Sequence, residues 1–345
     1  MRNAIHWWLV VILAGLVGQW GCDSDKNKSS NDAQDNAGNS TDKPGDTDAE
    51  PGGTDTEPND TGSTPYAQRL TAIDASAFQT CGLDEDGRAH CWSSRYNKEA
   101  DPPEDVTFIA ISAGYDHACG LDEDGRPHCW GNYGTQIEPP EDVAFTTIAA
   151  GTYHTCALDA DGNVHYWGNT VLGIDLEGNL LGHGTPPEGV TFSAISAGDG
   201  YICGIRKNDG KAQCWGSDPF GRTEPPEDMT FTTIATGEYH ACGLDEGGKA
   251  HCWGYNYSGQ TEPPEDVIFT AITSCGQHTC GLDADGVAHC WGINHDREGK
   301  EIGQATPPEG VTFSAISASF YYTCGIRTED GIVVCWGEQP GNLWQ

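Results

Sequence analysis

Cysteine is the residue whose spacing in this chain most clearly implies covalent chemistry. Of 15 cysteines, twelve form six pairs, each separated by ten or eleven residues across a Gly-containing turn. Where the turn is one residue longer, as at 206–210, the pair is retained, which indicates that the two thiols face each other on a hairpin. The N-terminal segment has the features of a secreted protein, and such thiols are oxidised by default in secreted proteins. We therefore predict six local disulfides: Cys81–Cys91, Cys119–Cys129, Cys203–Cys214, Cys242–Cys252, Cys280–Cys290 and Cys324–Cys335.

Other states of the cysteines remain open on the sequence alone. The pairs could be buried free thiols, or could form a zinc site with His90 or His128, although neighbouring side chains on a strand point to opposite faces. Besides Cys22, two cysteines stand outside the pairs, since Cys156 is opposite Tyr166 and Cys275 replaces a repeated glycine. We expect no bond between these two and regard both as buried and inert, with a reactive thiol or an intermolecular link as the alternative.

A second group of residues is suited to binding rather than to reaction. After a repeated Ala-Gly step, the chain carries aromatic and acidic side chains in a short loop between two expected strands. Tyrosine clusters suit protein interfaces because they offer a large contact area at little entropy cost. For the histidine that follows many of these loops, we favour a structural hydrogen bond to neighbouring backbone. The predicted binding residues are Phe78, Tyr115, Asp116, Tyr153, Asp199, Tyr201, Glu238, Tyr239, Gln277, Phe320 and Tyr321.

Catalytic and metal-binding motifs do not stand out in the sequence. We find no nucleophile–base pair, phosphate loop or dense metal signature, and the histidines and aspartates occupy repeat positions. The Asp-Glu-Asp-Gly turns lack the ligand series and downstream glutamate of an EF-hand, so turn chemistry accounts for them. We therefore predict no catalytic residue, no metal and no cofactor.

The cysteines and the candidate binding residues occur in internal repeats of the chain, and the fold of these repeats determines their positions. A tryptophan, usually within Cys-Trp-Gly, marks seven units at gaps of 38, 37, 48, 38, 38 and 45 residues. The two long gaps contain loops at 169–185 and 293–306. Asp-Gly turns between alternating strands indicate hairpins, and the repeated Pro-Pro pair belongs at a strand start or on an edge strand. Each unit thus supplies about four short strands. The repeats predict an all-β, seven-bladed β-propeller whose marker tryptophans, Trp92, Trp130, Trp167, Trp215, Trp253, Trp291 and Trp336, pack between blades.

Residues 150–168 read AGTYHTCALDADGNVHYWG, and residues 259–264 read GQTEPP. The first segment resembles the typical repeat of the regulator of chromosome condensation family. The second segment and the length of the repeat are more similar to a short bacterial form of this family, the secreted β-lactamase inhibitory protein II. The resemblance covers 65–345 and implies a seven-bladed propeller. Eukaryotic members exchange nucleotide on a small GTPase through an inserted wedge that this chain lacks. The inhibitory form binds enzymes through loops on one face, and the resemblance places the residues after the Ala-Gly steps in those loops.

The N-terminal segment has targeting features. The apolar run at 7–17 is too short to span a bilayer comfortably and is typical of a signal peptide. Gly21-Cys22 resembles a bacterial lipoprotein cleavage site, although Gln19 departs from the pattern, so an ordinary secretory signal is the alternative. We predict a signal peptide at 1–21, a lipidated Cys22 with a disordered acidic linker at 22–64, and a propeller at 65–345. The protein would be lipid-anchored in the bacterial cell envelope, at the outer membrane or cell surface.

Charge narrows the range of partners. The chain has 17 Lys and Arg against 52 Asp and Glu, a net charge of −35. Nucleic acid and anionic membrane surfaces would be repelled, leaving the lipid anchor as the membrane contact. Self-repulsion favours a monomer, and a protein with a basic surface or a divalent cation would fit better. We predict a non-catalytic protein-binding module, such as an inhibitor or receptor. The alternatives are a glycan-binding module, because aromatic platforms also stack on sugars, and an enzyme that uses the central channel.

Ring closure gives a first testable prediction. The last unit ends soon after Trp336 without a Pro-Pro-Glu segment, and residues 64–68 align with the missing piece. We predict that these residues pair with the last blade. A chain that begins at Arg69 should then have a markedly lower melting temperature than one that begins at Thr64, because the seam loses this pairing. Equal melting temperatures in thermal unfolding would contradict the prediction.

Overall fold

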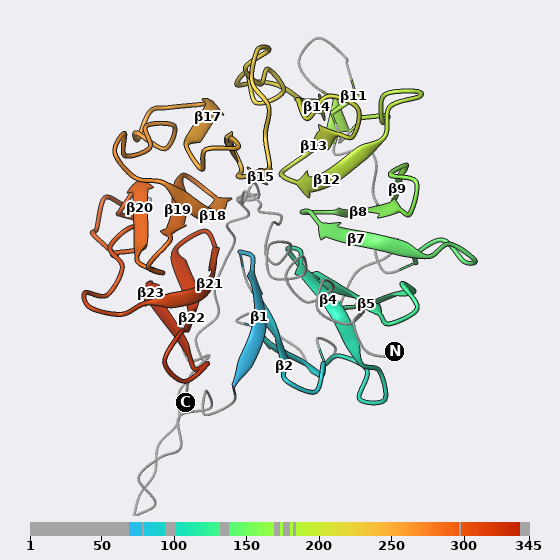
Figure 1. Cartoon of the computed structure of the whole chain (residues 1–345), viewed down its shortest axis with the longest axis horizontal. Coiled ribbons are helices and arrows are strands. Elements are labelled where there is room, and N and C mark those ends of the chain that lie inside the picture. The colour runs from blue at the N-terminus through green and yellow to red at the C-terminus, as the bar shows by residue number, and fades with distance from the viewer. Residues whose placement is uncertain are drawn as a thin grey trace, which may run out of the picture.

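The computed structural model describes residues 69–77, 79–93, 101–131, 138–168, 173–174, 180–181, 184–296 and 298–338. These residues form seven three-stranded antiparallel sheets that stand around a central axis like blades (Figure 1). The prediction of an all-β, seven-bladed propeller is confirmed. The predicted signal peptide, Cys22, the linker, the closing segment 64–68 and Phe78 lie outside the described residues. Within the described part, no helix has the length and apolar character needed to span a membrane.

Each blade runs outward from the axis in chain order. The first strands of neighbouring blades contact one another around the whole ring (Figure 1). These inner strands are β1 (Leu70–Ala75), β4 (Phe108–Ala113), β7 (Phe145–Ala150), β12 (Phe192–Ala197), β15 (Thr233–Thr236), β18 (Phe269–Cys275) and β21 (Phe313–Ala318). The middle strands are β2 (Gln79–Asp84), β5 (His117–Asp122), β8 (His154–Asp159), β13 (Tyr201–Arg206), β16 (His240–Leu244), β19 (His278–Asp283) and β22 (Tyr322–Arg327). The outer strands are β3 (Ala89–Ser93), β6 (Pro127–Gly131), β9 (Val164–Gly168), β14 (Ala212–Gly216), β17 (Ala250–Gly254), β20 (Ala288–Gly292) and β23 (Val333–Gly337). A separate two-stranded sheet pairs β10 (Gly173–Ile174) with β11 (Leu180–Leu181) in the first long loop.

The expectation of four strands per blade was wrong, because each blade has three. The described Pro-Pro segments form turns and irregular backbone instead of an outer strand. They touch the sheets through isolated bridges such as Lys211–Thr230 and Val287–Thr312. Proline has no backbone N–H, so two adjacent prolines remove the donors that a fourth ladder would need.

Successive blades are joined by one repeated hydrogen bond. Phe108 N donates to Gly87 O at 2.7 Å, so the start of one inner strand is held by the hairpin turn of the preceding blade. Gly87 has a φ of 76°, a conformation that glycine adopts without steric cost. The same bond occurs between the last blade and the first, where Leu70 N donates to Gly331 O at 3.0 Å. The described residues therefore close the ring through a contact of the same type that joins the other blades.

All six predicted disulfides are present. The paired cysteines lie directly opposite each other in the strand register, with Cα–Cα distances of 4.0–4.1 Å. Cys156 is a free, fully buried thiol, and burial raises its pKa well above the usual range, so it is inert as expected. Cys275 is also buried but is disulfide-bonded, which corrects the expectation of an inert free thiol there. The sequence argument paired cysteines only within a hairpin and so could not find this bond.

The apolar cores lie between blades. In one of them, Cys81 and Leu83 of the first blade pack against Phe108, Ala118 and Trp130 of the second. Six further clusters repeat this arrangement around the ring, including the seam between the last blade and the first. Each marker tryptophan belongs to such a cluster, which confirms its predicted place. A single blade therefore has no core without its neighbours.

A belt of buried polar side chains surrounds the axis. Ser112, Ser196, Thr273 and Ser317 each accept a hydrogen bond from an N–H of the next inner strand, at 2.9–3.2 Å. In the first blade the equivalent residue is Asp74. Its carboxylate accepts from Ala113 N at 2.7 Å and from the hydroxyls of Ser112 and Ser317, both at 3.1 Å. Burial raises the pKa of Asp74 to about 8, although these hydrogen bonds oppose the shift.

Asp74 therefore predicts a pH-dependent stability. Because its folded pKa lies above the value of 3.8 expected in the unfolded chain, ionisation costs more in the fold, and stability falls as pH rises from about 4 to about 8. Asp74→Asn keeps the shape and removes the ionisation. Relative to this variant, the wild-type chain should lose on the order of a few kcal/mol of unfolding free energy across that interval. Denaturant unfolding at several pH values measures the difference, and parallel pH profiles would contradict the assignment.

Candidate functional site

The strand register gives the propeller two different faces. His117 pairs with Gly131, so the loop before the middle strand and the loop after the outer strand leave the blade at the same end. Tyr201–Gly216 and His240–Gly254 repeat this arrangement. We call this end the loop face. The opposite end carries the hairpin turns between middle and outer strands, and we call it the turn face.

The predicted binding residues all belong to the loop-face segments, but their exposure differs. Tyr115, Tyr201, Glu238 and Phe320 are buried. The partly exposed members are Asp116, Tyr153, Asp199, Tyr239, Gln277 and Tyr321. Phe78 lies outside the described residues. The structure therefore separates a buried set from a set that is partly exposed.

Tyr201 belongs to a structural column rather than to the surface. It pairs with Gly216 as His117 pairs with Gly131, so it occupies the histidine position of its blade. Its hydroxyl donates to His240 O at 2.6 Å and Gly237 O at 3.1 Å in the next blade. Placing Tyr201 in an exposed tyrosine cluster was therefore wrong. Asp199-Gly200 fills the loop, and the two-residue distance from Tyr201 to Cys203 matches that from His117 to Cys119.

The histidines of this column also connect neighbouring blades. The Nε2 atoms of His117, His240 and His278 lie 2.7–2.8 Å from a threonine hydroxyl of the following blade. Burial lowers the pKa of His117 and His278 to about 4 and that of His240 to about 3, so all three are neutral at pH 7. These histidines make hydrogen bonds within the fold, but their partners are side-chain hydroxyls of the next blade and not the neighbouring backbone that we expected.

The central mouth on the loop face has two chemically different halves. Tyr115 and Phe320 belong to an apolar cluster with Ala77 and Ala318, from blades one, two and seven. Asp199 and Glu238 occupy the equivalent loops of blades four and five, and Thr152 Oγ1 donates to Asp199 Oδ1 at 3.4 Å. One side of the mouth is therefore apolar and the other acidic.

An exposed aromatic cluster lies farther from the axis on blades four and five. It consists of Phe220, Tyr239, Tyr255 and Tyr257, which we call the aromatic patch. The rings of Phe220, Tyr239 and Tyr255 lie within 5.1–5.9 Å of one another, and Tyr257 stacks on Tyr255 at 6.2 Å with an interplanar angle of 17°. Phe220 is 39% exposed and Tyr257 is 86% exposed. Large apolar rings at such exposure are typical of binding surfaces.

Sequence reasoning identified only Tyr239 of this patch. The other three rings lie in the segments after Cys-Trp-Gly, which were not among the predicted binding segments. The signal was present, because a hairpin with opposed cysteines must return the chain to the loop face by the following glycine. Tyr255-Asn-Tyr257 directly follows such a glycine.

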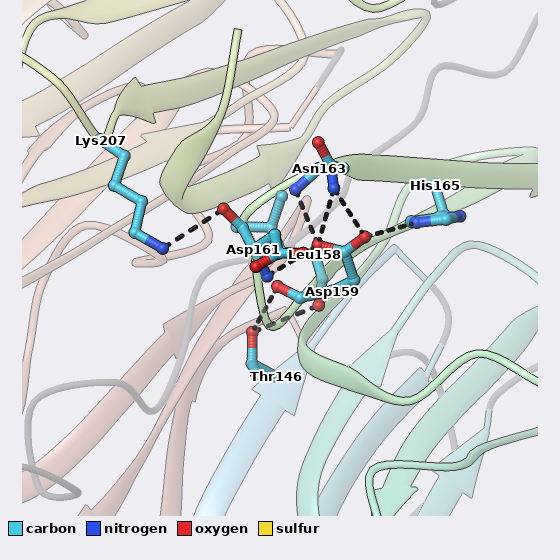
Figure 2. Close-up of polar contacts among 7 residues, drawn as sticks. All are labelled: Thr146, Leu158, Asp159, Asp161, Asn163, His165 and Lys207. Atoms are coloured by element: carbon cyan, nitrogen blue, oxygen red, sulfur yellow. Dashed lines mark hydrogen bonds and ion pairs between the residues drawn. The ribbon is translucent and has the colours of Figure 1, made fainter. Parts of the chain in front are cut away.

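The turn face carries a different repeated arrangement, shown for the third blade in Figure 2. Asp159 Oδ1 accepts from the backbone N–H groups of Asp161 and Asn163 at 3.0 and 2.9 Å, and Oδ2 lies 3.0 Å from His165 Nε2. Burial acts to raise the pKa of Asp159, but the bonds from Asn163 and His165 outweigh it and hold the pKa below its usual range. These contacts are turn chemistry, and the described residues contain no group of three potential metal ligands.

Comparison with known proteins agrees with this geometry. Residues 108–134, 145–173 and 231–260 match the family model described as regulator of chromosome condensation (RCC1) repeat. Three segments of the propeller are thus similar to the RCC1 repeat. No curated protein sequence matches it.

Solved structures with RCC1-type folds extend this result. The ectodomain of the receptor kinase CR4 from Physcomitrella patens matches with 25% identity and a TM-score of 0.63, over 77% of this chain and 72% of that chain. The ectodomain of the receptor kinase ACR4 from Arabidopsis thaliana matches with 26% identity and a TM-score of 0.61, over 77% and 95%. Yeast RCC1 (Prp20), solved with Kap60, matches with 16% identity and a TM-score of 0.58, over 78% and 81%, and shows the shared fold.

A pair of tyrosine variants separates structure from surface. Tyr201→Phe removes a buried hydroxyl that bonds two carbonyls of the next blade, so the unfolding free energy should fall by about 1 to 2 kcal/mol. Tyr257→Phe removes a hydroxyl from an exposed ring and should leave stability unchanged. Denaturant unfolding of both variants measures the difference. Equal stability of Tyr201→Phe and the wild-type chain would show that Tyr201 is not an inter-blade contact.

Proposed function

We propose that this protein is a non-catalytic protein-binding module that presents its loop face to a partner with a basic surface. We also propose that a lipid on Cys22 holds the protein in the cell envelope. Because the fold itself hosts many activities, the proposal rests on the surface chemistry.

Charge distribution is the observation that carries the proposal. Among the described residues, the loop face has two basic side chains, Arg222 and Lys300. Arg222 is buried, and Lys300 forms an ion pair with Glu338 at 3.4 Å. The other described basic residues lie at or beside the hairpin turns of the turn face, namely Arg69, Arg88, Arg126, Arg206, Lys207, Lys211, Lys249 and Arg327. In the part of the chain that the structure describes, the loop face thus combines carboxylates and exposed aromatic rings with few accessible cations, which suits a basic protein partner.

The proposed location agrees with the covalent chemistry. Six disulfides in a single domain are typical of proteins that fold outside the reducing cytosol. The two plant structures are ectodomains of receptor kinases, so propellers of this kind also occur outside the cell in membrane-anchored proteins. A lipid on Cys22 followed by an acidic linker would hold this propeller away from a membrane in a comparable way.

Glycan binding is the second candidate, and one observation favours it. Tyr255 and Tyr257 form a nearly parallel stack whose outer ring is 86% exposed, which would offer a flat platform for a sugar ring. The two functions differ in their dependence on salt. Association with a basic protein should slow as ionic strength rises, whereas stacking on a neutral sugar should not.

Affinity capture from envelope and secreted extracts tests the proposal. The full chain is immobilised beside a loop-face variant, Tyr153→Ala/Tyr239→Ala/Tyr321→Ala, and a turn-face control, Ile268→Ala. We expect a basic protein that both the wild-type chain and the control retain and the loop-face variant loses, with an association rate that falls as salt increases. Equal retention by all three proteins, or retention of polysaccharide alone, would contradict the proposed function.

A further inference from the structure

We infer that the aromatic patch, together with Glu224 and Glu262, is a subsite for one arginine or lysine side chain of the partner. The inference rests on the proposed function and specifies which atoms of the loop face recognise positive charge. It adds Phe220, Tyr255, Tyr257 and the two glutamates to the binding surface.

The two loops that form the patch have the same conformation. Each begins with a side-chain oxygen that caps the turn at the equivalent position: Asp218 Oδ2 accepts from Thr223 N at 3.3 Å, and Asn256 Oδ1 accepts from Thr261 N at 3.1 Å. Each also contains a glycine with positive φ, 71° at Gly221 and 74° at Gly259. The loops therefore present their rings from a hydrogen-bonded backbone and not from a loose segment, which lowers the entropy cost of binding.

Both loops end in an exposed glutamate. Glu224 N donates to Gly221 O at 3.4 Å, and Glu262 N donates to Gly259 O at 3.1 Å, which turns each glutamate back toward its own loop. Asn256, between Tyr255 and Tyr257, donates from Nδ2 to Glu262 Oε1 at 2.9 Å. One carboxylate is thus hydrogen-bonded to the residue between the two stacked tyrosines. Among the described residues of these loops, Arg222 is the sole cation.

Arg222 shows how a guanidinium interacts with aromatic rings at this site, one of which, Phe220, belongs to the patch. Its central carbon lies 4.5 Å from the centroid of Tyr201 and 5.9 Å from that of Phe220, within the range of cation–π attraction. The side chain is buried and donates to the carbonyl oxygens of Glu238 and Ser217, so it cannot reach the outer surface of the patch. Among the described residues, no cation of this kind contacts the exposed ring of Tyr257 or the carboxylate of Glu262. An arginine or lysine from a partner would supply it.

A cationic side chain suits the combination of an exposed aromatic ring and a carboxylate better than other ligands of the same size. A carboxylate near an aromatic face repels phosphate and sulfate, and an apolar anchor would desolvate the charge of Glu262 and leave it only the neutral amide of Asn256 as a partner. A guanidinium or ammonium satisfies both groups at once, because it can lie over the ring and donate to the carboxylate.

Binding of a defined peptide to the full chain tests the inference. The probe is a fluorescent peptide of alternating arginine and glycine, measured by fluorescence anisotropy. Tyr257→Ala should weaken binding by about 3- to 30-fold, whereas Tyr257→Phe, which keeps the ring, should bind like the wild-type chain. Glu262→Gln should weaken binding by about two- to fivefold. Two substitutions on the turn face serve as matched controls, Ile268→Ala for the exposed apolar residue and Glu246→Gln for the exposed carboxylate, and neither should change the affinity.

Replacing the arginines of the peptide by citrulline removes the charge but keeps the shape. We expect this peptide to lose most of its affinity for the wild-type chain and to be insensitive to Tyr257→Ala. Equal affinity of the arginine and citrulline peptides would overturn the recognition of a cation. Arginine-dependent binding that Tyr257→Ala leaves unchanged would overturn the patch as its site, while the proposed function would stand. The proposed function fails separately, if no partner in the capture experiment depends on the loop face.

Discussion

Burial of apolar surface between blades is the constraint on which the rest of this structure depends. A three-stranded sheet of this size has no second layer of its own, and its large side chains find partners only in the next blade, as Trp130 does against Cys81 and Leu83. The arrangement is stable only if it is continued around the whole ring, since an open end would expose one complete core. The contact between Leu70 and Gly331 closes that end. In six blades, a disulfide also links the middle strand to the outer strand, which stabilises a sheet of only three short strands.

The interfaces also determine which polar residues are available for function. Buried polar groups favour hydrogen bonding, and here the belt around Asp74 and the column of His117, His240, His278 and Tyr201 form hydrogen bonds across blade boundaries. Their chemistry is used in holding the ring together. Recognition is left to side chains that project beyond the interfaces, where the loop face combines aromatic rings with carboxylates and the turn face holds most of the described cations.

The repeated features of the fold could be predicted from the sequence because the same pattern of residues recurs in seven repeats. Opposed cysteines indicated the hairpin register, and regularly spaced tryptophans indicated the cores between blades. Individual departures were harder to predict. Tyr201 looked like a surface tyrosine although it stands one residue later in its loop than Tyr153 and Tyr239 do, and counting back from Cys203 would have corrected this. Phe220 and Tyr257 were missed because exposure depends on which end of the blade a connection leaves. The Pro-Pro segment suggested a fourth strand, but its missing N–H donors prevent the ladder.

Hydrogen–deuterium exchange of the full chain, with and without the arginine–glycine peptide, tests most directly the claim that a rigid ring recognises positive charge through one face. The account predicts slow exchange in the inner and middle strands with or without peptide. It also predicts peptide-dependent protection in the segments 217–224 and 255–262, with no change in the hairpin turns. Protection of the turns instead, or no protection in either loop at a saturating peptide concentration, would contradict it.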